Sequence, residues 1–354
     1  MFSTPFVLLF TLLLSIPLLF LYGPHILSLK PSSDITQRDE LADIKLFRRA
    51  ALSSFHRSAG ASTSLHLGAA NPKLKIAFMF LINSDLAFAP LWEKFFETHD
   101  GLFNIYIHCD PAVEVRKPGG VFQNRFIDSK PTRRGSPTLI SAARRLLATA
   151  ILDDSTNFYF ALLSQSCVPL HSFNYVYSTL FSSPSFFSFP FKKPMRSSYI
   201  EILSDEPTLP DRYVARGDHV MLPEVRYDQF KIGSQFFVLN RKHALSVIKD
   251  RKLWRKFKLP CLNVDSCYPE EHYFPTLLAM EDKEGCSGYT LTRVNWTAST
   301  GGHPHTYYPD EVSADLIHKL RASNFSSEYL FARKFAPESL MPLMEIVDSI
   351  ILKD

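Results

Sequence analysis

From residue 71 onward, short and wholly apolar runs alternate along the chain with apolar residues at helical spacing. The apolar runs, which are typical of strands buried on both faces of a sheet, lie at 75–82, 103–108 and 158–163. The helical spacing lies at 89–98 and 137–152. A strand at 234–240, a helix at 241–250 and a helix opening at Pro269 continue the series. This alternation predicts an α/β fold with a mainly parallel sheet.

The N-terminus has a different pattern. Residues 1–29 contain no Asp, Glu, Lys or Arg, and residues 6–22 are almost all apolar. About 20 apolar residues are enough for a helix to cross a bilayer. A cleaved signal peptide would have a basic start and a small-residue cleavage site, and we find neither, while the polar segment that follows argues against a buried core helix. We therefore expect a cytoplasmic start and transmembrane anchor at 1–22, in which Pro17 is tolerable.

Residues 23–70 are rich in Ser, Ala and charge, and we expect a stem or linker there, with a short amphipathic helix at 39–55. Asn71-Pro72 then marks the start of a domain predicted to span 71–354. Charge alone does not orient the anchor, because Lys30 and Arg38 by themselves would favour a cytoplasmic C-terminus.

Two features favour a lumenal domain instead. Tripeptides that begin at Asn295 and Asn324 match the acceptor pattern for N-glycosylation, although this pattern often arises by chance. The five cysteines have no zinc-like spacing, and Cys261, Cys267 and Cys286 lie close enough in sequence for a lumenal disulfide. Five buried free thiols fit the sequence nearly as well.

The composition limits the classes of function. With 46% hydrophobic residues, most of the chain can pack into a core. A net charge of +4 with only short basic runs argues against a nucleic-acid partner. Dinucleotide-binding, P-loop, zinc-protease and serine-hydrolase motifs are absent from the sequence. The loop containing His303 and His305 is too weak a pattern to predict a metal site.

Candidate chemistry lies where predicted strands end, because ligands of such sheets bind beyond the carboxyl ends of the strands. Polar residues follow three of these strands, at 83–85, 108–110 and 164–166. Glu270 and Glu271 follow Pro269 at a predicted helix start. Carboxylates favour the positive end of a helix, so a purely structural role fits as well as a general base does.

A departing nucleoside diphosphate would need its growing negative charge stabilised. The sequence contains no Asp-x-Asp pair of the kind that holds a metal ion for this purpose. Basic side chains would then replace the metal, and Arg321, Arg333 and Lys334 are candidates near the C-terminus. Each of them, taken singly, also fits a solvated helix face.

Seven segments together resemble the core-2/I-branching β-1,6-N-acetylglucosaminyltransferase family, in its plant-type branch. They occur in order over roughly residues 73–336: IHCD at 107–110, RRLLA at 144–148, FALLSQSCVPL at 160–170, GSQFF at 233–237 with NRK at 240–242, PEEHYF at 269–274, VNW at 294–296 and LFARKF at 330–335. Their shared order and spacing make the resemblance specific.

The resemblance implies a GT-A-type fold, type II topology in the Golgi membrane, an inverting mechanism, a UDP-sugar donor and no metal or other cofactor. Glu271 corresponds to the family's catalytic base, and Glu270 takes the preceding acidic position on the acceptor side. Four further positions carry over: Lys334 to the lysine facing the donor diphosphate, Asp110 to the acidic residue ending the nucleotide-side strand, Gly233 to the donor site and Trp296 to an aromatic lining the acceptor sugar. The second diphosphate-facing basic residue has no clean counterpart, and Arg321 is a guess for it.

The chain departs from the plant-type pattern at several positions. Arg134 stands where a Trp before Gly is usual, Ala143 where a Glu is usual, and Gln165 replaces another Glu. Residues 83–85 replace a usually basic loop. These changes bear on donor and acceptor identity.

The sequence therefore predicts an inverting, metal-independent glycosyltransferase that moves a sugar, with GlcNAc expected, from a UDP-sugar to a hydroxyl of a glycan or glycoprotein. A non-catalytic Golgi carbohydrate-binding paralogue on the same fold is the alternative. A glycoside hydrolase would need a second carboxylic acid across the scissile bond, for which the sequence offers no convincing candidate. A soluble secreted enzyme is a further variant.

Overall fold

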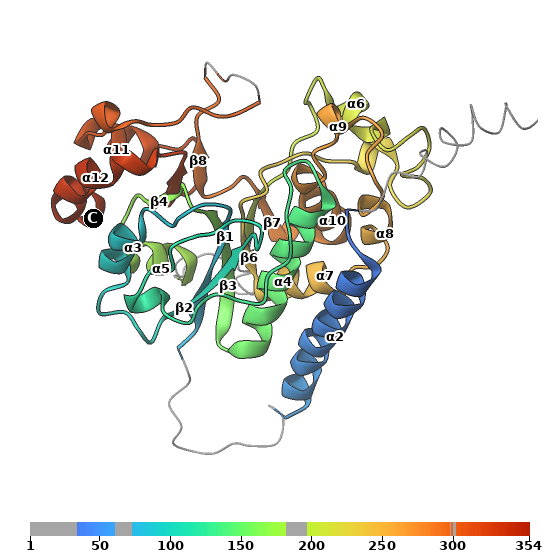
Figure 1. The fold of residues 1–354 in the computed structure, drawn as a ribbon, viewed down its shortest axis with the longest axis horizontal. Helices are drawn as coiled ribbons and strands as arrows, with labels where there is room; N and C mark the ends of the chain where they lie inside the picture. Colours follow the sequence, from blue (N-terminus) through green and yellow to red (C-terminus); the bar gives the residue numbers. More distant parts are fainter. Residues whose placement is uncertain (1–33, 61–72, 182–196, 298, 300–301) are drawn as a thin grey trace, which may run out of the picture.

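The computed structural model describes residues 34–60, 73–181, 197–297, 299 and 302–354 (Figure 1). The predicted membrane anchor at 1–22 lies outside these residues. Within them, no helix is both long enough and apolar enough to cross a membrane. Two β-sheets form the centre of the described chain, and helices pack around the larger one.

The strands are β1 Lys75–Ile82, β2 Phe103–Cys109, β3 Asn157–Ser164, β4 Val168–Pro169, β5 Ser198–Glu201, β6 Val238–Asn240, β7 Cys286–Gly288, β8 Thr292–Val294 and β9 Phe331–Arg333. The α-helices are α2 Gln37–Gly60, α3 Ala89–Phe96, α4 Pro137–Asp153, α5 Phe173–Phe181, α6 Leu209–Val214, α7 Arg241–Lys249, α8 Trp254–Phe257, α9 Val264–Cys267, α10 Tyr273–Asp282, α11 Ala314–Arg321 and α12 Leu340–Ile346.

The larger sheet has the strand order β2-β1-β3-β6-β5-β7. β2, β1 and β3 are parallel to one another. β6 is antiparallel to both of its neighbours, β3 and β5, and β7 is parallel to β5. It follows that β5 and β7 point the same way as β1–β3. The prediction of a mixed α/β fold with a mainly parallel sheet is confirmed, with β6 reversed.

Two separate apolar layers cover the two faces of this sheet. Phe78 and Phe80 of β1 pack into one layer together with Trp92 of α3. Ala77 and Met79 pack into the other, against residues of α4, α7 and α10. Successive residues of a strand point to opposite faces, so a strand covered on both sides needs apolar residues at every position. That requirement explains the wholly apolar runs in the sequence.

The clearest sequence patterns lead to the observed elements. β1, β2, β3, α3, α4 and α7 all lie within two residues of the predicted ranges at each end. Local capping explains two of the helix starts. Ser136 accepts a hydrogen bond from the Thr138 N–H ahead of α4, and Asn240 accepts one from the His243 N–H ahead of α7.

The strand predicted at 234–240 is shorter than expected, because its first half forms no ladder pairs with the neighbouring strands. The Gly233 N–H donates to the backbone oxygen of Glu271 at 2.9 Å, and the Ser234 N–H donates to Oε2 of Glu201 at 3.0 Å. Ladder pairing with β3 begins only at Val238.

The helix predicted to open at Pro269 is also divided. A single 3₁₀ turn, Pro269–Glu271, comes first, and α10 begins at Tyr273. Pro275 stands four residues after Glu271 and has no N–H, so the Glu271 carbonyl cannot receive the usual helical bond. That carbonyl accepts from Gly233 instead.

The smaller sheet has the strand order β4-β9-β8. It pairs the C-terminal strand β9 with β4, which follows β3 closely in the chain. β8 and β9 run parallel, with Val294 opposite Arg333. The residues that follow these two strands, Trp296 and Lys334 among them, therefore leave the sheet side by side.

The helix predicted at 39–55 is α2, and it packs against α4 and α7 (Figure 1). Asp43 of α2 forms a two-pronged ion pair with Arg145 of α4, with N–O distances of 2.5 and 2.8 Å. Both residues are buried. The Arg144 guanidinium lies over the rings of Phe47 and Trp254. Although the sequence places α2 in the stem, the helix packs on the α/β body. The predicted domain limits at 71 and 354 stay predictions.

Replacing Asp43 with Ala should lower the free energy of unfolding by about 3–5 kcal/mol, because it leaves the buried Arg145 guanidinium without its counter-charge. Urea unfolding would measure the loss. Glu40→Ala is the matched control on α2, since its partner Lys258 is partly exposed and the change should cost at most about 1 kcal/mol. Equal costs for the two variants would contradict the inference that Asp43 anchors α2.

Candidate active site

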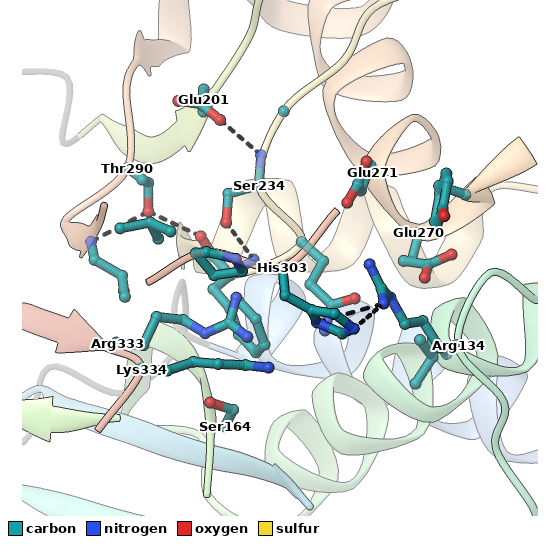
Figure 2. Close-up of a pocket in the computed structure, with 18 of the residues that line it drawn as sticks. Arg134, Ser164, Glu201, Ser234, Glu270, Glu271, Thr290, His303, Arg333 and Lys334 are labelled. Atoms are coloured by element: carbon teal, nitrogen blue, oxygen red, sulfur yellow. Dashed lines mark hydrogen bonds between the residues drawn. The ribbon is translucent and has the colours of Figure 1, made fainter. Parts of the chain in front are cut away.

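A cavity of about 740 Å³ lies at the edge of the larger sheet where its parallel strands end (Figure 2). Ile82 and Ser164 bring the ends of β1 and β3 to its wall, and Glu201 brings the end of β5. Because β6 is reversed, the residues that enter it, starting at Gly233, reach the same edge. This is the position at which ligands of open α/β sheets bind, and the size suits a small-molecule ligand.

Glu270 and Glu271 share the cavity wall but occupy different environments. Glu271 has a side chain 30% exposed, and its Oε2 lies 2.7 Å from Nη1 of Arg212. Glu270 is buried, and its Oε1 accepts a hydrogen bond from the Gly135 N–H at 2.9 Å. Glu270 Oε2 has no hydrogen-bond partner among the described residues. Glu271 is therefore the carboxylate that a ligand can reach.

The burial of Glu270 has an electrostatic consequence. Removal from water disfavours the charged carboxylate and raises the pKa of Glu270 to about 7, and the neighbouring charge of Glu271 adds to this effect. Near neutral pH a substantial fraction of the Glu270 side chains therefore carries a proton.

Tyr268 positions the two arginines beside this acidic pair. Its ring lies 5.4 Å from the Arg134 guanidinium carbon and 5.2 Å from that of Arg212. Its backbone has φ of 34°, a left-handed conformation that is costly for a bulky residue. The disulfide between Cys261 and Cys267 ends one residue before it. Such strain persists only where the surrounding structure holds the residue in place.

A group of cations occupies another part of the cavity wall. Arg333 ends β9 and Lys334 follows it, whereas Arg134 precedes α4. His303 lies between Arg134 and Lys334 in Figure 2. Burial lowers the pKa of Lys334, and the charges of Arg333 and Arg134 lower it further. The Arg333 guanidinium packs over the Phe236 ring at 4.4 Å.

Two further predicted site residues, Trp296 and Gly233, line the cavity. Trp296 is 55% exposed and lines the cavity beyond β8. Gly233 lines it where the chain approaches β6. A Cβ on Gly233 would come within 2.0 Å of the Glu201 backbone oxygen, so no other residue fits there without displacing the strand. Lys334 completes the set, together with Glu270 and Glu271.

Asp110, predicted on the donor side, does not line the cavity. Its Oδ1 accepts from the Ala112 N–H, and its Oδ2 accepts from the N–H and hydroxyl of Thr132. Burial alone would raise the pKa of Asp110, but these hydrogen bonds outweigh it and hold the pKa below its usual range. Asp110 therefore fixes the loop that carries Thr132 and Arg134 to the cavity.

The guess of Arg321 as a diphosphate-facing residue needs correction. Arg321 is buried in α11, away from the cavity wall, and donates to the backbone oxygens of Leu170, Ile350 and Ile351. It joins α11 to the segment after β4 and to the C-terminal turn. Because Arg321 lies near Lys334 in the sequence, we expected the two side chains to share a site. The Arg321 side chain is instead directed toward the backbone oxygens of these distant segments.

The remaining sequence candidates lie outside the acidic and cationic groups. Asn324 is exposed, and Asn295 is half-buried with its Oδ1 accepting from the Thr297 N–H. Their glycosylation stays a prediction. Cys261 and Cys267 form a disulfide, one of the pairings that the sequence left open. His305 pairs with Glu311 rather than with His303.

No group of three or more His, Cys, Asp or Glu residues in the described ranges is arranged to hold a metal ion. Independence from metal stays a prediction that biochemistry must test.

Sequence reasoning missed Arg212 and Glu201 and noted Arg134 only as a departure from a pattern. Arg212 lies on the short helix α6, whose sequence has no motif. Glu201 ends a strand of four residues, too short to be recognised from alternation. One general rule could have pointed to Glu201: ligands of such sheets bind at the ends of the strands, where polar residues are therefore candidates.

Comparison with known proteins gives two results. Residues 76–321 match the family described as Core-2/I-Branching enzyme. A protein named Glycosyltransferase BC10, from Oryza sativa subsp. japonica, is 28% identical in an alignment 323 positions long. The alignment covers 77% of this chain and 76% of that relative.

Glu270→Gln should remove a pH dependence of stability. The raised pKa means that the folded protein keeps the Glu270 proton while the unfolded chain loses it, so stability is full below about pH 4.5 and is lost as pH rises to about 7. The variant should escape a loss of about 3 kcal/mol between pH 4.5 and pH 8. Urea unfolding across this range measures it, with the exposed Glu281→Gln as control. Parallel pH profiles for wild type and Glu270→Gln would contradict the expectation.

Arg321→Met should lower the free energy of unfolding by about 3 kcal/mol, because buried carbonyl oxygens lose their donor. It should leave the affinity for UDP unchanged, because Arg321 does not reach the cavity. Thermal or urea unfolding and calorimetric UDP titration measure the two quantities. Lys319→Met, an exposed change on the same helix, should alter neither. A selective loss of UDP affinity in Arg321→Met would restore the sequence-based assignment.

Proposed function

The chain belongs to the Core-2/I-branching enzyme family of glycosyltransferases, and from this premise we propose that it transfers GlcNAc from UDP-GlcNAc to a glycan or glycoprotein hydroxyl. Transfer inverts the anomeric carbon and proceeds without a metal ion. The observation that carries the proposal is that Glu271 and Lys334 line one cavity at the ends of the parallel strands.

Glu271 is the general base of the proposed reaction. An inverting transfer needs a carboxylate that removes the proton from the acceptor hydroxyl as its oxygen attacks the sugar. Glu271 is partly exposed, and the Arg212 ion pair at 2.7 Å fixes the direction of its carboxylate. Glu270 is less suited to this role because it is buried and its Oε1 is already engaged by the Gly135 N–H.

Lys334 offsets the charge of the departing diphosphate. The bond to the anomeric carbon breaks as the acceptor oxygen forms a new bond, and the electron pair leaves with UDP. A partly buried ammonium group stabilises that charge more strongly than one in bulk water, since the local dielectric is lower. Arg333 beside it adds to the positive potential.

The acceptor sugar is proposed to pack on Trp296. An exposed indole that lines the same cavity as Glu271 offers an apolar face to a sugar ring. Glu270 lies behind Glu271 on the same wall and completes the acceptor side.

The proposed location is the Golgi membrane, with a single N-terminal anchor and the domain in the lumen. The disulfide between Cys261 and Cys267 supports an oxidising compartment. The exposed Asn324 supports access of its sequon to glycosylation.

Glu271→Gln should lower the turnover number by about 10²–10⁴-fold, because the acceptor proton loses its base. UDP affinity should change by no more than about twofold, since the charge on the diphosphate side is untouched. The measurement is UDP release and sugar transfer by the full-length protein, across a panel of UDP-sugars and with EDTA present.

The exposed Glu281→Gln serves as the control for removal of a carboxylate. EDTA-resistant turnover that disappears in Glu271→Gln would support the proposal and identify the donor. Unchanged turnover in that variant would exclude Glu271 as the base. Absence of both turnover and UDP binding would favour the non-catalytic carbohydrate-binding paralogue instead.

A further inference from the structure

Three of the cations that line the cavity form no ion pair with an acidic residue in the described part of the chain. Among the described residues, no carboxylate oxygen lies within 4.0 Å of a side-chain nitrogen of Arg134, Arg333 or Lys334. Mutual repulsion is felt within the group, because the charges of Arg333 and Arg134 lower the pKa of Lys334. Like charges gathered without counter-charges destabilise a fold unless an anion joins them.

Arg134 is the member of this group that comes from a distant part of the chain. It lies just before α4, whereas Arg333 is the last residue of β9 and Lys334 follows it. Its Nη1 donates to Nε2 of His303 at 2.6 Å, and its Nη2 donates to the backbone oxygen of Gly302 at 2.8 Å. The guanidinium therefore spans from the loop before α4 to the loop after β8.

His303 acts as a neutral brace in this arrangement. Arginine can only donate, so Nε2 of His303 must accept and carry no proton. Burial and the charges of Arg134, Lys334 and Arg333 lower the pKa of His303, which agrees with a neutral ring. The brace fixes the guanidinium without neutralising it.

The fixed guanidinium keeps donors for a ligand. Of its five N–H groups, two are engaged by His303 and Gly302. Tyr268 lies against one face of the group and restricts its movement. A planar fork of this kind matches the oxygens of a phosphate, whereas the lysine acts as a point charge.

We propose that Arg134, braced by His303, closes a clasp with Arg333 and Lys334 around the diphosphate of the nucleotide-sugar donor. The inference rests on the proposed function, since it assumes a UDP-linked donor. Arg134 then acts as the second diphosphate-facing cation, supplied from the α4 side of the cavity.

UDP and UMP distinguish a diphosphate clasp from a general effect on the nucleotide site. In Arg134→Gln the affinity for UDP should fall about 10- to 100-fold, because charge-assisted hydrogen bonds to the phosphate are lost. The affinity for UMP should stay within about threefold. Calorimetric titration of the full-length protein gives both dissociation constants, and the ratio of the two is the decisive quantity.

Arg226→Gln is the control for loss of an arginine, because Arg226 is exposed and pairs with Asp228 outside the cavity. It should leave both affinities unchanged. Arg134→Lys keeps the charge without the planar fork, so its UDP affinity should fall between those of wild type and Arg134→Gln. Circular dichroism and thermal unfolding would show that each variant is folded.

Two results would overturn the clasp and leave the proposed function standing. If Arg134→Gln binds UDP as tightly as wild type does, while Lys334→Ala binds it more weakly, the diphosphate does not reach Arg134 and the proposed function stands. If UDP and UMP affinities fall equally in Arg134→Gln, Arg134 supports the nucleotide site without contacting the second phosphate. Failure of the wild-type protein to bind UDP would overturn the proposed function together with the clasp.

Discussion

The hydrogen bond from the Gly233 N–H to the Glu271 carbonyl ties the acidic side of the cavity to the sheet. It exists because Pro275 cannot supply the helical donor that Glu271 would otherwise have. A side chain at Gly233 would collide with the Glu201 backbone, so the close approach depends on glycine. One missing N–H and one missing Cβ together fix where the exposed carboxylate stands relative to the strand ends.

The cavity separates charge of opposite sign without neutralising it across the site. On one side, Glu271 pairs with Arg212, which fixes the direction of its carboxylate. On the other, Arg333 and Lys334 have no carboxylate partner among the described residues. A reaction that generates negative charge on a leaving group while a base takes up a proton benefits from this separation, because each group already faces the charge that will develop. If Glu271 formed an ion pair with Arg333 or Lys334 instead, neither the base nor the cation would be free to act.

Sequence patterns predicted the framework well and the site only in part. The strands β1–β3 are buried on both faces, so nearly every position in them is apolar and the runs are easy to recognise in the sequence. Glu271 and Lys334 reach the cavity wall, as their motifs indicated. Arg321 does not, because its direction depends on carbonyl oxygens of distant segments, which no local pattern records. Arg212 was missed for the same reason, since its partner Glu271 is 59 residues away.

The cationic side of the cavity also depends on a distant segment, the start of helix α2. Asp34, just ahead of α2, accepts hydrogen bonds from Arg133 and from Ser136, the residue that caps α4. Between these two lies the turn that presents Arg134 to the cavity and whose Gly135 N–H holds Glu270. The same helix is anchored further along by the buried pair of Asp43 and Arg145. A segment that composition alone assigns to a stem therefore supports the loop on which both the acidic pair and the cation group depend.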